Sequence, residues 1–182
     1  MLYLRKLILF LLALQAKQGA DDKNFKPIEE MTGADTLIER PLATMVTKES
    51  DWLALWREHK EMIGDPPASP PGWTNYDAPP KVDFQKYVIV VYFGGQGKGV
   101  DGYQVVKVDT KGKTNVVQIA PHFFGSTVLS NSYGMWMFPR PKKPVELQLL
   151  VDVVNGEPQF RKLGEFAPPK VSAVPGRTGG GS

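Results

Sequence analysis

The stretch YVIVVYF, residues 87–93, decides the fold of this chain. Consecutive β-branched and aromatic residues without a charge are typical of a strand that is buried on both faces. Two further strand patterns follow at residues 103–108 and 114–119, and the short polar segment 109–113 between them contains a glycine. This arrangement predicts a hairpin with a five-residue loop.

Working outward, the chain offers several more strand candidates. Residues 42–46 and 134–138 are short apolar runs, and residues 145–153 begin with alternating apolar and polar side chains. Asn155-Gly156 is a strong tight-turn signal, so we expect residues 159–163 to return antiparallel to the strand before it. The total is about six strands.

One helix is predicted, over residues 48–61. Thr47 offers a side-chain oxygen for the helix start, and two acids follow in the first turn. The helical spacing places four large side chains on one face: Trp52, Leu55, Trp56 and His59. We expect the tryptophans to pack on a sheet.

One helix and about six sequentially connected strands predict an antiparallel α+β domain over residues 42–166. Its architecture is either a β-sandwich or a half-open barrel with the helix as a cover. Residues 21–41 are polar and interrupted by proline and glycine, which predicts a flexible segment. Residues 167–182 contain proline, glycine and serine, which predicts a disordered tail. Residues 64–80 are dense in proline, which predicts an extended loop.

The amino terminus has the pattern of a secretory signal peptide over residues 1–20. Arg5-Lys6 precede the apolar run 7–14, and small residues follow it. The run is short for a bilayer-spanning helix, which needs about 20 residues. A short membrane anchor and an ordinary buried helix are the alternatives. The pattern predicts an exported protein, in the periplasm, the cell envelope or outside the cell, with no transmembrane span after signal removal.

The charge and the cysteine content exclude several kinds of function for this protein. The chain of 182 residues carries a formal charge of +3, but Arg5, Lys6 and Lys17 lie in the first twenty residues, so the remainder is neutral. A neutral remainder gives no electrostatic argument for nucleic-acid binding. The chain has no cysteine, which excludes disulfides, thiol catalysis and cysteine-ligated metals.

No motif predicts catalysis. Residues 97–102 read GKGVDG, but a strand pattern follows where a dinucleotide site requires a helix. His59 and His122 lie far apart without a recognisable set of metal ligands. We therefore expect that the protein is not an enzyme and that it binds no cofactor and no metal. An enzymatic role would require Asp83, Asp101 or His122 to meet around a pocket.

Glycine and aromatic residues near the strand ends are the remaining signal. Glycines permit close backbone approach, and rigid aromatics supply contact area at low entropy cost. The predicted contact rim for a protein partner consists of Gly94, Gly95, Gly97, Gly99, Gly102, Tyr103, Asn131, Tyr133 and Trp136. The alternatives are that the glycines form an ordinary mobile hairpin loop and that Trp136 and Phe123 fill the core.

The chain resembles the PrcB C-terminal-domain family over roughly residues 43–151. The resemblance is carried by Trp52-Leu53-Ala54-Leu55-Trp56, by Val82-Asp83-Phe84 before the buried strand, by Gly102-Tyr103, by Ser132-Tyr133 with Pro139, and by Lys142-Lys143-Pro144-Val145. The family's Thr-Gly-Gly-Tyr turn is Val100-Asp101-Gly102-Tyr103 in this chain, so only its Gly-Tyr is kept.

The resemblance implies an exported, non-catalytic domain that acts as an accessory subunit of an envelope or secreted protease complex. A similar Gly-Tyr loop occurs in chagasin-like protease inhibitors, which makes a loop-based inhibitor one alternative. A carbohydrate- or peptidoglycan-binding domain with Trp73, Tyr76 and Trp136 as stacking platforms is another.

Overall fold

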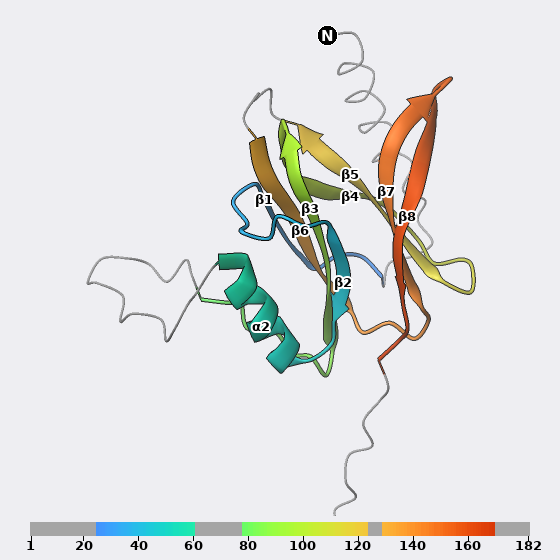
Figure 1. Ribbon diagram of the computed structural model, residues 1–182. Coiled ribbons are helices and arrows are strands. Elements are labelled where there is room, and N and C mark those ends of the chain that lie inside the picture. The colour runs from blue at the N-terminus through green and yellow to red at the C-terminus, as the bar shows by residue number, and fades with distance from the viewer. Residues whose placement is uncertain (1–24, 61–77, 124–128, 170–182) are drawn as a thin grey trace, which may run out of the picture.

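The computed structural model describes residues 25–60, 78–123 and 129–169. This part of the chain is mostly β, with two four-stranded sheets and one helix (Figure 1). The elements are β1 (Glu29–Gly33), β2 (Leu42–Val46), α2 (Glu49–Lys60), β3 (Tyr87–Lys98), β4 (Val100–Asp109), β5 (Asn115–Phe123), β6 (Leu129–Pro139), β7 (Val145–Val154) and β8 (Glu157–Phe166).

The first sheet has the order β1-β6-β3-β2 and is antiparallel throughout. The second sheet has the order β4-β5-β7-β8, and its β5–β7 pair is parallel. The expectation of a wholly antiparallel domain is therefore wrong. Between β5 and β7 the chain makes β6 in the other sheet, so β7 enters from the same end as β5, with Asn115 opposite Val145.

The buried stretch at residues 87–93 contributes to two cores, one on each face of the first sheet. Val88, Val90 and Tyr92 pack against the second sheet. Their neighbours Ile89, Val91 and Phe93 pack on the opposite face, under the helix. Because successive side chains of a strand point to opposite faces, a continuous apolar run is the pattern that a doubly covered strand requires.

The inner core lies between the two sheets. Its first-sheet members also include Trp136 and Phe138, and they meet a second-sheet group of Tyr103, Val117, Ile119, Val145, Leu147 and Leu149. Phe25 joins them by stacking on Phe138, with ring centroids 4.9 Å apart.

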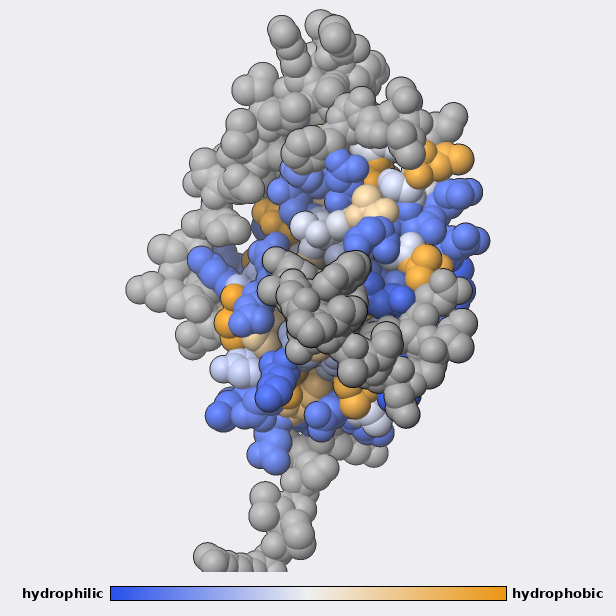
Figure 2. Space-filling view, turned by 90° about the vertical axis from the view of Figure 1, so that its left-hand side faces the viewer, coloured by the Kyte–Doolittle hydropathy of each residue, from blue (hydrophilic) through white to orange (hydrophobic). Residues whose placement is uncertain are grey.

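Helix α2 covers the outer face of the first sheet, as Figure 1 shows. The four side chains that the spacing placed on one face are all buried, so this prediction is confirmed. The Trp52 indole N–H donates to the Pro80 carbonyl at 3.0 Å, which fixes the chain where it enters the next described segment. The side of the molecule on which α2 lies is mostly hydrophilic, with apolar residues in separate spots (Figure 2).

Two sequence predictions about extent are corrected. Residues 29–33, expected within a flexible segment, form β1 on the edge of the first sheet, and Ile38 is 3% exposed. The described residues hold eight strands where about six were expected. The short, polar β1 has no apolar alternation to reveal it, because a strand with one outward face and one free edge needs few apolar residues.

Asn155 and Gly156 both have positive φ, at 52° and 85°, which confirms the predicted tight turn between β7 and β8. The predicted signal peptide at residues 1–20, Trp73 and Tyr76 of the proline-rich loop, and residues 170–182 of the tail lie outside the described residues. Within the described residues, no helix has the length and apolar character that a membrane crossing demands.

Candidate functional site

The glycine-rich segment is strand, not loop. β3 continues through Gly94, Gly95 and Gly97 to Lys98, with a register shift between Phe93 and Gly95. Only Gly99, at φ 67°, separates β3 from β4. A bulge and a one-residue turn replace the predicted mobile loop, because glycine permits both without steric cost.

Tyr103 belongs to the core and not to an exposed rim. Its ring packs edge-on against Tyr92 with centroids 4.7 Å apart, and the residue is 7% exposed. A Cβ on Gly94 would lie 1.9 Å from the Tyr103 hydroxyl oxygen. The absence of a side chain at Gly94 therefore leaves the room that the Tyr103 ring occupies.

Gly102 has an equally structural role. Its φ is 134°, and a Cβ there would lie 1.9 Å from Thr32 Oγ1. That oxygen accepts the Tyr103 backbone N–H at 2.9 Å, and the Thr32 hydroxyl donates to the Tyr133 carbonyl at 3.1 Å. One threonine thus joins β1, β4 and β6, which explains why a glycine precedes the tyrosine.

Trp136 is fully buried in the inner core and lies over Gly134, where a Cβ would be 2.3 Å from the indole ring. The assignment of Trp136 to the contact rim is wrong, and its core alternative holds. Asn131 and Tyr133 are half-buried on the helix side of the same strand.

Asn131 and Tyr133 take part in a cluster with Asp35, His59 and Lys60, which we call the α2–β6 junction. The Lys60 ammonium lies 2.8 Å from the Asp35 carboxylate. The His59 ring contacts the Tyr133 ring edge-on, with centroids 4.5 Å apart. Backbone bonds close the cluster, from Thr36 N–H to the Asn131 carbonyl and from Leu37 N–H to the His59 carbonyl. The residues before β2 thereby tie the helix end to β6.

His59 is fully buried, and neither ring nitrogen has a hydrogen-bond partner among the described residues. Burial lowers the pKa of His59 to about 4; the Lys60 charge adds to the effect and the Asp35 carboxylate opposes it. A buried imidazole without a partner keeps its neutral form, because a charge there would lose its hydration.

Burial, and then the neighbouring Asp35 carboxylate, raises the pKa of Tyr133 to about 12. Burial also raises the pKa of Asp35, but its bond to Lys60 outweighs this, so the carboxyl is more acidic than usual. At neutral pH the junction therefore holds a protonated phenol, a neutral imidazole and one ion pair. Sequence spacing placed His59 on the same helix face as the two tryptophans, but nothing in the polar segment around Asp35 pointed to its role.

Beside the junction, β3 has an unpaired edge. Pairing with β2 ends at Phe93, whereas pairing with β6 continues to Lys98. The Glu39 carbonyl and Pro41 lie against Gly95, where a Cβ would be 2.8 Å and 3.0 Å from them. Beyond Gly95, no described strand pairs with the β2 side of residues 96–98. Apart from its chain neighbours, no heavy atom of the described residues lies within 4 Å of a Cβ built on Gly97. We call residues 96–98 the free edge of β3.

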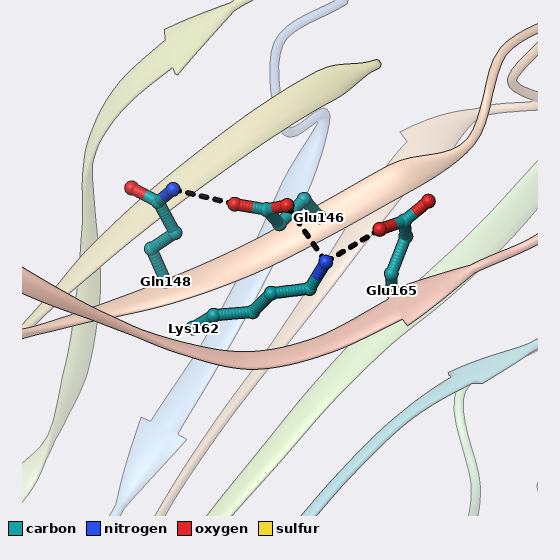
Figure 3. Close-up of polar contacts among 4 residues, drawn as sticks. All are labelled: Glu146, Gln148, Lys162 and Glu165. Carbon is teal, nitrogen blue, oxygen red and sulfur yellow. Dashed lines mark hydrogen bonds and ion pairs between the residues drawn. The ribbon is translucent and has the colours of Figure 1, made fainter.

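The outer face of the second sheet carries a polar ladder (Figure 3). Gln118 donates to Gln148 at 2.9 Å, and Gln148 donates to Glu146 at 2.6 Å. Lys162 then pairs with Glu146 at 3.0 Å and with Glu165 at 2.5 Å. These groups satisfy one another across β5, β7 and β8, so the ladder is part of how the sheet holds together.

In the described residues, no group of three or more metal-ligating side chains comes together. Of the acidic residues considered for catalysis, Asp83 is paired with Lys86 at 3.1 Å. Comparisons with protein-family models, with curated proteins and with solved structures find no match for this chain.

Proposed function

We propose that this chain is an exported protein-interaction domain and that its partner adds a strand to the free edge of β3. The observation that carries the proposal is that β3 extends beyond the end of β2, so that, within the described part of the chain, residues 96–98 pair with a strand on one side only. An exposed strand edge presents backbone N–H and C=O groups that a partner strand can satisfy.

The surroundings of this edge suit an added strand. Gln96 is exposed and lies opposite Asn131, which brings the edge next to the α2–β6 junction. Beyond its chain neighbours, no heavy atom of the described residues lies within 4 Å of a Cβ on Gly97, so a partner has room beside the face of the strand here. Backbone bonds would supply the affinity, and the side chains of the junction would supply the specificity.

The exported setting rests on the amino-terminal pattern, and the resemblance to the PrcB C-terminal domain suggests a secreted or envelope protease as the partner. In this proposal the two sheets form a β-sandwich with α2 on one outer face. The inhibitor alternative uses the same partner but predicts a loss of its peptidase activity on binding. The carbohydrate alternative is weakened because Trp136, one of its three platforms, is core.

The test uses proline substitutions at the free edge. Neighbouring residues of a strand direct their N–H groups to opposite sides, so one of Gln96→Pro and Gly97→Pro removes a free donor and the other removes a donor to β6. The variant that removes the free donor is recognised by its unchanged melting temperature, because it leaves the β3–β6 pairing intact. Gly97→Ala keeps the backbone N–H and places its new Cβ in open space, so it is the matched control.

The readout is capture of a secreted peptidase from the culture fluid by immobilised chain. We expect the proline variant with the unchanged melting temperature to lose capture and Gly97→Ala to retain it. Amide exchange in the complex should slow at residues 96–98. Full capture by that proline variant would rule out strand addition at this edge.

A further inference from the structure

We propose that one end of the second sheet binds anionic phospholipid headgroups at a cluster of four lysines, three of which are exposed. These are Lys111 and Lys113 in the β4–β5 turn and Lys142 and Lys143 in the β6–β7 connection, which together we call the lysine end. The proposal uses residues distant in sequence from the free edge of β3 and does not depend on it.

The parallel β5–β7 pair brings the two connections together. Because β5 and β7 start side by side, the turn before β5 and the connection before β7 lie at the same end of the sheet. The Asn115 N–H donates to the Pro144 carbonyl at 2.8 Å. The Lys143 ammonium donates to the carbonyls of Thr110 at 2.8 Å and Gly112 at 3.0 Å, which fixes one loop on the other.

The fixed loops concentrate positive charge. Lys111, Lys113 and Lys142 are exposed. The one acid in these two connections and at their strand ends is Asp109, whose carboxylate also accepts the Lys111 backbone N–H at 2.9 Å. Residues 21–182 carry equal numbers of basic and acidic side chains. The excess of lysines over acids at the lysine end is therefore balanced by acidic side chains elsewhere in these residues.

The chemistry of the lysine end favours a lipid surface over an acidic protein. Its exposed residues are lysine and glycine, without an exposed aromatic or aliphatic side chain among residues 111–113 and 142. Protein interfaces have an apolar, often aromatic, centre, whereas a fluid anionic surface requires only accessible charge. Lysine ammonium groups act as hydrated point charges and suit headgroups without a fixed geometry.

The experiment is co-sedimentation of the full chain with vesicles of phosphatidylcholine, alone or mixed with phosphatidylglycerol. The triple variant Lys111→Glu, Lys113→Glu and Lys142→Glu tests the lysine end and leaves Lys143 to hold the loops. The control triple variant, Lys26→Glu, Lys48→Glu and Lys81→Glu, changes net charge equally at exposed lysines elsewhere. Thermal melts check that both variants are folded.

We expect wild type and control to bind the phosphatidylglycerol vesicles in a salt-sensitive way. The lysine-end variant should bind at least roughly 100-fold more weakly, because the loss of each lysine costs about fivefold and each new carboxylate is repelled by the surface. Binding to phosphatidylcholine alone measures any contribution of the apolar residues 7–14. An equal loss of vesicle binding in both variants would show that binding depends only on net charge, and it would overturn the proposal. So would competition by inorganic phosphate at matched ionic strength, or tighter binding to polyglutamate than to the vesicles.

Discussion

Protonation of His59 should weaken the docking of α2, and the effect can be measured by replacing the ring. His59→Phe keeps an aromatic side chain in contact with Trp56, Phe93 and Tyr133 but removes the titrating group. The groups that face it are Lys60 on its own helix, Asp35 before β2 and the Tyr133 phenol on β6.

The size and direction follow from the pKa of His59. The pKa falls from 6.5 in the unfolded chain to about 4 in the folded protein. The unfolded state therefore binds the proton first as pH decreases, and the stabilisation present above pH 6.5 is lost progressively down to about pH 4. At 1.36 kcal/mol for each pKa unit, the wild type should lose about 3 kcal/mol relative to the variant over this range.

The assay is urea unfolding of both proteins at a series of pH values from neutral to about pH 4, followed by circular dichroism. The difference between the two free energies of unfolding cancels the groups that the proteins share. The Asp35 carboxyl is present in both proteins, and its lowered pKa moves its protonation toward the acid end of the window. Parallel pH curves for wild type and His59→Phe would refute the argument that the buried imidazole is neutral for lack of hydration.

Three further outcomes follow from the packing. Gly94→Ala should lower the free energy of unfolding by about 1–3 kcal/mol, because its Cβ would collide with the Tyr103 hydroxyl, whereas Gly97→Ala in open space should be near neutral; chemical denaturation compares the two. Thr32→Val should cost about 1–3 kcal/mol by removing the acceptor of the Tyr103 N–H, and faster exchange of that amide would confirm the cause. Glu146→Gln should change the free energy of unfolding by less than about 1 kcal/mol, since the ion pair between Glu146 and the half-exposed Lys162 is screened by water. A larger loss would show that the polar ladder is cooperative.

The elements with strong periodicity could be predicted from sequence. The helix face with Trp52 and His59, the buried strand at residues 87–93 and the Asn155-Gly156 turn are where the patterns placed them. Each depends on local spacing or local backbone chemistry, which one sequence contains in full.

The candidate site was predicted less well, because it depends on contacts between distant residues. Glycines before Tyr103 have the composition of a loop, and only the paired strands show that Gly94 and Gly102 make room for Tyr103 and Thr32. Asp35 meets Lys60 from a segment whose polar composition gives no strand or helix signal. The α2–β6 junction therefore required the structure, whereas the position of His59 on the packed face of the helix did not.

The placement of β6 has a consequence for how the molecule is assembled. β6 lies centrally in one sheet, yet the chain makes it between β5 and β7, which are neighbours in the other. Neither layer is encoded by a contiguous piece of the gene, so no cut in the polypeptide yields an intact half. The interleaved order couples both layers in a single cooperative unit. The first sheet is complete only after β6, which ends at Pro139, has left the ribosome, and the second only after β8, which ends at Phe166.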